Sequence, residues 1–170
     1  MMTRERLLSL AARLPSALLP FAAALGLAEA GFIPALGAAA AALLGYWGAH
    51  LLAPWAVKQA QPKNLLLCTA VLFVVLAVLL IVAVEQHVMW AVLLLSATAG
   101  LSGPPERFIW PSRRLDRTAL GAGFLLAVIC GFVSAWTVPL VAAAFIAATA
   151  VPVLVMTRIQ PPKNSDTANL

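Results

Sequence analysis

The stretch LLLCTAVLFVVLAVLLIVAV, residues 65–84, decides the fold class of this chain. It carries no charge, and about 20 apolar residues are enough for a helix to cross the roughly 30 Å hydrocarbon core of a bilayer. The rest of the chain agrees, because 63% of its 170 residues are hydrophobic and only 10% are charged. A soluble domain carries about 25% charged residues. We therefore expect an integral membrane protein.

Apolar runs on both sides of this stretch extend the prediction to an all-α bundle of six transmembrane helices within residues 1–158. The predicted spans are 14–32, 35–55, 65–84, 88–103, 119–136 and 138–157. Gly31 and Pro34 separate the first two spans, and residues 137–139 separate the last two, so each pair is expected to form a tight helical hairpin. The polar, proline-led tail, residues 159–170, is expected to be disordered and cytoplasmic.

The eleven Lys and Arg residues predict the orientation of the bundle. They lie in the N-terminal segment, which ends at Arg13, in the loops after the second and fourth spans, and in the tail. Six spans place all of these segments on one side, and the positive-inside rule makes that side cytoplasmic. We therefore expect a multi-pass protein of a bacterial-type inner (plasma) membrane, with both termini in the cytoplasm.

Glu29 lies in GLAEAGF, residues 26–32, and is the only charged residue between Arg13 and Lys58. Residues 28–30 also resemble a signal-peptide cleavage site, but the apolar run continues past them, so we expect an uncleaved first helix. Glu29 follows Arg13 by sixteen residues, or about 24 Å of helix, which places it toward the outer boundary. Two readings remain open: a transport or proton-coupling carboxylate, or a helix end wetted by water and headgroups.

Glu85 and His87 are expected at the same depth as Glu29. The three side chains would form an outer polar cluster if their helices converge, or would be separate loop residues in water. Cys68 and Cys130 lie inside apolar runs and are expected to be small core residues.

No enzyme signature is present in the sequence, such as H-E-x-x-H, G-x-S-x-G or a P-loop. We therefore expect no catalytic activity, no cofactor and no metal site. The basic residues are confined to short clusters between apolar runs, which indicates membrane topology and not nucleic-acid binding. The expected partners are membrane lipid and either a second copy of the chain or a larger membrane complex.

Small residues recur every four positions in two of the predicted spans. The second span carries Gly37, Ala41, Gly45 and Ala49, and the fifth carries Ala119, Gly123, Ala127, Gly131 and Ala135. Small residues let membrane helices approach closely, so these stripes predict helix packing or a partner interface. Their matching places in two groups of three spans suggest a 3+3 internal repeat, although Ala and Gly are also common in such helices by chance.

The loop SGPPERFIWPSRRLDRT, residues 102–118, is the richest polar stretch. Arg107, Arg113, Arg114 and Arg117 are expected to face anionic headgroups, where each basic residue is worth about 1 kcal/mol. The alternative reading is a docking surface for a partner protein.

Two stretches resemble one six-helix half of a major facilitator superfamily transporter. GYWGAHLLAPWAVKQAQPKNLLL, residues 45–67, is similar to the end of that family's second helix, its basic loop and its third helix. GAGFLLAVICGFVSAWTVP, residues 121–139, is similar to the Gly-rich fifth helix. The resemblance implies that the second and fifth helices line a junction between halves, so a second copy or a partner would have to complete the pathway.

The sequence departs from that family's motifs at two places. The Gly, Asp and Gly-Arg positions of the signature loop fall near Ala53, Val57, Ala60 and Gln61, and the Gly-Pro pair of the fifth helix is replaced by 135–136, Ala-Trp. Two alternative functions therefore remain open. One is a small secondary-transporter-like protein that works as a dimer, with Glu29 as its carboxylate. The other is a non-catalytic accessory or assembly subunit of a larger membrane complex.

Overall fold

The computed structural model describes residues 4–59, 61–102, 113–132 and 137–158; within its helices, the side chains of residues 4–6, 50, 53, 113–116, 127, 130–132 and 157–158 are not described. The described residues form six α-helices and one short 3₁₀ turn. These are α1 Arg4–Gly26, η1 Ala28–Ala30, α2 Phe32–Gln59, α3 Pro62–Glu85, α4 Met89–Leu101, α6 Arg113–Phe132 and α7 Thr137–Arg158. No strand occurs in these ranges, so the expected all-α class is confirmed.

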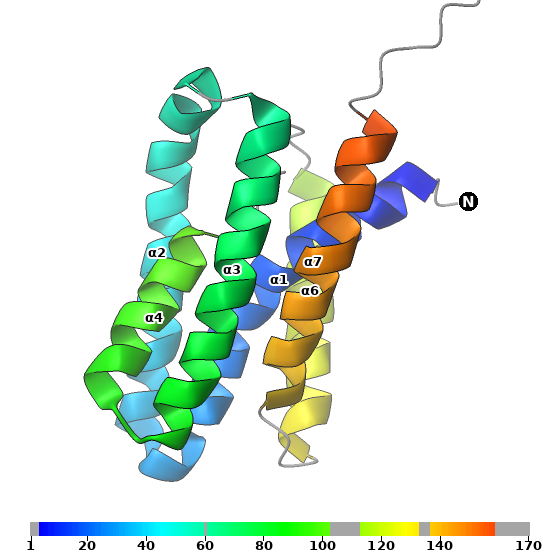
Figure 1. Ribbon diagram of the computed structural model, residues 1–170. Coiled ribbons are helices and arrows are strands. Elements are labelled where there is room, and N and C mark those ends of the chain that lie inside the picture. The colour runs from blue at the N-terminus through cyan, green and yellow to red at the C-terminus, as the bar shows by residue number, and fades with distance from the viewer. Residues whose placement is uncertain (1–3, 60, 103–112, 133–136, 159–170) are drawn as a thin grey trace, which may run out of the picture.

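Helix α1 lies between the group α2, α3 and α4 and the pair α6 and α7 (Figure 1). It packs extensively against α7, α6 and α2, and more lightly against α4. Contact on several sides requires an apolar surface over most of its circumference. The four consecutive residues 17–20, which include Leu18 and Leu19, are all buried and together face every side of the helix.

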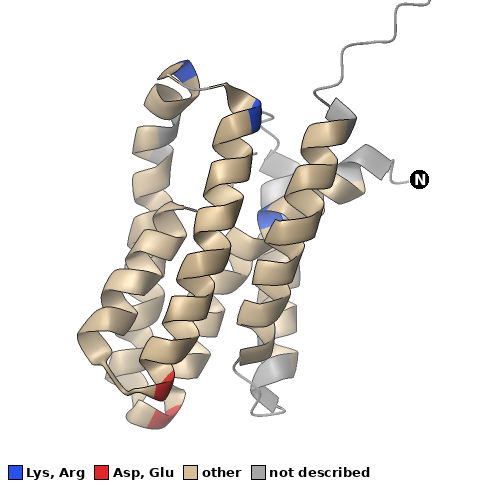
Figure 2. Ribbon diagram, viewed as in Figure 1, with Lys and Arg blue, Asp and Glu red and all other residues tan. Residues whose placement is uncertain are grey.

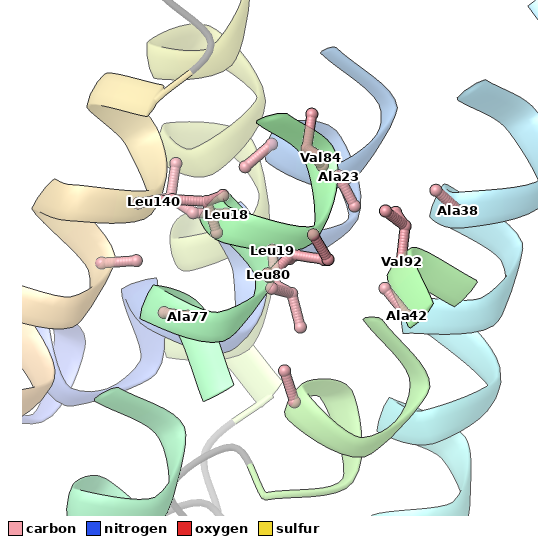
Figure 3. Packing of buried hydrophobic residues seen from close by; sticks show 14 of the residues in the cluster. Leu18, Leu19, Ala23, Ala38, Ala42, Ala77, Leu80, Val84, Val92 and Leu140 are labelled. Atoms are coloured by element: carbon pink, nitrogen blue, oxygen red, sulfur yellow. The ribbon is translucent and has the colours of Figure 1, made fainter. Parts of the chain in front are cut away.

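Not every helix packs on α1, because α3 packs mainly on two other helices. Helix α2 lies along α4, and α3 contacts both α4 and α7. Helices α6 and α7 are consecutive, but they pack mainly against α1 and only slightly against each other. Figure 3 shows the central apolar cluster, in which Leu80 of α3 and Leu140 of α7 meet the α1 leucines.

Large apolar side chains cover the outside of this bundle. Phe32 and Leu44 on α2, Val71 on α3, Leu94 on α4 and Phe145 on α7 are each at least 65% exposed. Soluble monomers rarely expose contiguous apolar patches beyond a few hundred Å². Four helices, α1, α2, α3 and α7, are long and apolar enough to cross a membrane, and α4 is a shorter apolar helix. Together these features indicate a membrane protein.

The first helix begins before the predicted membrane span. The sequence suggested a span beginning at residue 14, after a basic segment, whereas α1 begins at Arg4 and includes Arg13 in its interior. Arginine is a good helix former, so a charge marks a change of environment without ending a helix. Cys68 also departs from expectation, because it is exposed on α3 and is not a core residue. The predicted disordered tail lies outside the described residues.

Candidate functional site

The turn between α1 and α2 positions Glu29 at one end of the bundle. Helix α1 ends at Gly26, and η1 follows, with the Gly31 amide donating to the Ala28 carbonyl at 3.2 Å. Gly31 then takes φ 115, a conformation that side-chain-bearing residues rarely adopt, and α2 can begin at Phe32. Glu29 is exposed on this turn. The structure thus places it at a helix end and outside the packed interior.

The turn between α3 and α4 positions Glu85 and His87 at the same end. The Val88 amide donates to the Ala83 carbonyl at 3.1 Å, and the His87 amide donates to the Val84 carbonyl at 3.0 Å. This is the Schellman arrangement, whose turning residue is usually glycine. Here His87 holds that place with φ 55, a strained backbone for a residue with a side chain. Glu85 and His87 are both exposed.

Figure 2 shows the described acidic residues at one end of the bundle and the lysines of the α2–α3 turn at the other end. Glu29, Glu85 and His87 therefore lie at one end, opposite Lys58 and Lys63. Among the described residues, no group of three or more His, Cys, Asp or Glu is arranged to hold a metal ion. All three side chains are exposed, so they do not enclose an acid–base pair.

The small residues of α2 pack against α4. A Cβ atom at Gly45 would overlap the Ala97 carbonyl oxygen, and one at Gly100 would overlap the Ala42 carbonyl oxygen. The two backbones therefore cross in direct contact at Gly45 and Gly100. The other predicted α2 positions are Gly37, whose Cβ would lie 3.6 Å from Leu93 Cδ2, Ala41, which is half-buried, and Ala49, which is buried.

The small residues of α6 pack against α1. A Cβ atom at Gly123 would lie 3.1 Å from the Ala17 carbonyl oxygen, and Ala119 is buried. Phe21 and Phe124 meet at the same interface, edge to face, with ring centroids 5.5 Å apart. Of the other predicted positions on this stripe, Ala127 and Gly131 lie in α6 without described side chains, and Ala135 lies outside the described residues.

The most unusual residue of the interior is Arg13. Its burial was not predicted from the sequence. Its side chain is only 5% exposed, and Ser9 and Ser16 on the same helix are also buried. Residues 9, 13 and 16 follow the three- and four-residue spacing of one helix face. The apolar residues on both sides, from Leu7 onward, were the signal that the helix continues through this charge.

Helix α4 adds a second polar group to the interior. Ser96 is fully buried, and its hydroxyl is the one buried side-chain polar atom without a hydrogen-bond partner among the described residues. A buried hydroxyl without a partner costs free energy, so such a group is uncommon in a packed bundle. Ser102 at the end of α4 is also buried, and its hydroxyl donates to the Ala99 carbonyl at 3.1 Å.

The predicted basic surface is described only in part. Arg107 lies outside the described residues, and Arg113 and Arg114 belong to the first turn of α6 without described side chains. Arg117 is exposed on α6. An exposed guanidinium at a helix end suits either an anionic headgroup or a protein partner.

Comparison with known proteins adds no relative to this description. No family model matches the chain, no curated protein matches it, and no solved structure matches it. The function is therefore inferred from the positions of the chain's own residues.

Proposed function

We propose that this chain is a small secondary-transporter-like membrane protein that works as a dimer. It crosses a bacterial-type inner membrane with six helices and keeps both termini in the cytoplasm. The support for this orientation is the charge distribution, with Lys58 and Lys63 at the end of the bundle opposite Glu29 and Glu85. Lys and Arg accumulate on the cytoplasmic side of membrane proteins.

The single observation that carries the proposal is the pairing of the helices, which supports a 3+3 repeat. Helix α1 packs against α6 and α7, and α4 packs correspondingly against α2 and α3. In a 3+3 repeat the first three helices correspond in order to the last three, so α3 corresponds to α7. These two helices pack against each other, which is consistent with that correspondence. Internal repeats of this kind are characteristic of secondary transporters, whose substrate sites lie near the repeat interface.

The small residues of the second and fifth helices make contacts that correspond in the same way. Gly45 of the second helix lies against α4, the fourth helix, and Gly123 of the fifth lies against α1, the first. One pair departs from the scheme, because α1 also packs on α2, and the described residues of α4 and α6 make no comparable contact. The proposed repeat would therefore be an approximate one.

A transporter of charged solutes needs polar groups within the membrane, and Arg13 supplies a charge there. Charged residues inside membrane helices are costly, face the interior and mark functional sites by default. Arg13 therefore replaces Glu29 as the leading functional residue, because Glu29 is exposed at a turn. Glu29 keeps a secondary role in the proposal, as a charge at the outer mouth.

The alternative is a non-catalytic accessory or assembly subunit of a larger membrane complex. The observation that favours it is the packing of the single chain, in which α2 and α4 cross so closely that no Cβ fits at Gly45 or Gly100. A bundle of this kind is suited to docking as a rigid unit. Its exposed apolar helix faces would then contact partner subunits.

One experiment separates the two functions: purification in a mild detergent, followed by mass determination of the intact assembly. A homodimer is the expected result. Stoichiometric recovery of unrelated subunits would remove the stand-alone transporter and establish the accessory function. The role of Glu29 is tested by a Glu29→Gln variant. If this variant forms the same dimer and transports equally well, Glu29 does not have the proposed role.

A further inference from the structure

The C-terminal part of α2 extends beyond its neighbouring helix. Helix α2 has 28 residues, or about 42 Å at 1.5 Å per residue, which exceeds the roughly 30 Å hydrocarbon core. Helix α4 has only 13 residues, and its last residue, Leu101, lies beside Gly48, where a Cβ would be 3.3 Å from Leu101 Cδ1. The segment of α2 from Leu51 to Gln59 therefore extends past the end of α4.

This segment carries apolar side chains that the described helices leave uncovered. Leu51 is 82% exposed and Trp55 is 65% exposed, and no described residue from Leu51 to Gln59 is buried. Residues 51, 55 and 58 lie on one helix face, so Lys58 continues the line that Leu51 and Trp55 begin. A surface that changes from leucine to tryptophan to lysine over about two turns matches a change from hydrocarbon to headgroup.

Charge favours an anionic occupant at this position. Lys58 and Lys63 are both exposed, and they flank the α2–α3 connection, Lys58 in the last turn of α2 and Lys63 in the first turn of α3. The two acidic side chains that the structure describes, Glu29 and Glu85, lie at the opposite end of the bundle. An occupant must therefore offer negative charge to the lysines and, directly beside it, an apolar region to Trp55.

We propose that Lys58, Lys63 and Trp55 form a binding surface for anionic phospholipid. The lysine ammonium groups contact the phosphate or a second anionic group of the headgroup, and the Trp55 ring lies at the glycerol level. A zwitterionic lipid provides an apolar region for Trp55, but its headgroup has no net negative charge to pair with the lysines. A nucleic acid or acidic peptide satisfies the lysines but not the exposed apolar face. This surface does not depend on the proposed transport function.

The test uses quenching of tryptophan fluorescence by brominated lipid in vesicles that contain the full chain. Two single-tryptophan proteins are compared, one retaining Trp55 and the other retaining Trp90, with the remaining tryptophans changed to Phe. Trp90 is a matched control because it is 78% exposed and lies at the other end of the bundle, at the start of α4. The vesicles contain three parts phosphatidylcholine to one part phosphatidylglycerol, with bromine on one or the other lipid.

Trp55 is expected to be quenched more by brominated phosphatidylglycerol than by the same mole fraction of brominated phosphatidylcholine. Each lysine should enrich the anionic lipid roughly fivefold at this position. The preference should disappear in Lys58→Gln/Lys63→Gln and persist in Lys58→Arg/Lys63→Arg. Trp90 should show no preference, and its unchanged emission in the lysine variants would show that they are folded. Equal quenching of Trp55 by both lipids, or a preference that survives the Gln changes, would overturn the proposal.

Discussion

Replacing Gly45 with alanine tests whether α2 and α4 touch through their backbones. The added Cβ would overlap the Ala97 carbonyl oxygen and would also lie 2.8 Å from the Ala97 carbonyl carbon. Both are backbone atoms, so no side-chain rotation relieves the overlap and the two helices must separate. Overpacking costs about 1–3 kcal/mol of stability. Because the obstacle here is backbone, we take the upper value, about 3 kcal/mol. Alanine returns about 0.5–1 kcal/mol by removing the entropic cost of glycine.

The expected net loss for Gly45→Ala is therefore about 2 kcal/mol, or about 30-fold in the unfolding equilibrium. The assay is unfolding of the purified protein by SDS in mixed micelles, followed by circular dichroism. Gly121→Ala is the matched control, because a Cβ there meets nothing within 4 Å. That variant should be unchanged or stabilised by up to about 1 kcal/mol. A Gly45→Ala protein as stable as Gly121→Ala would refute the close crossing.

Two other substitutions test separate features of the structure. His87→Gly should stabilise the chain by about 1 kcal/mol because glycine adopts the positive φ of the α3–α4 turn without strain; the same SDS titration measures it, and a stability no higher than that of His87→Ala would show that the strain is absent. In the detergent-solubilised protein with Cys68→Ser and Cys130→Ser, Arg13→Cys should react with a maleimide at least about tenfold more slowly than Lys63→Cys, because a buried thiol reacts only on local opening. Equal rates would contradict the burial of Arg13.

The positions of the helices could largely be predicted from the sequence, because apolar runs and helix breakers are local features. Residues 65–84 lie within α3, and the break at Gly31 and Pro34 corresponds to η1 and the start of α2. The burial of Arg13 was not predicted, because the basic segment that ends at this residue was expected to lie in water. The charge is instead buried inside the bundle, where its environment depends on helices far away in the sequence.

The contacts between helices could not be predicted, because periodicity identifies a packing face without naming its partner. The stripe containing Gly45 could have faced a neighbouring chain, and only the fold places it against Gly100. The cluster of Glu29, Glu85 and His87 illustrates the same limit. A shared depth was inferred from helix lengths, but the orientation of three exposed side chains on two turns depends on the tertiary arrangement.

Labelling of single cysteines in sealed right-side-out vesicles tests directly whether the two ends of the bundle lie on opposite sides of a membrane. Lys63→Cys and Glu29→Cys are compared in a background without Cys68 and Cys130, with protease-accessible tags on both termini. The proposed orientation predicts that an impermeant maleimide modifies Glu29→Cys in intact vesicles, whereas Lys63→Cys and both tags become accessible only after the vesicles are opened. Modification of both cysteines from the same side, or a tag accessible from outside, would contradict it.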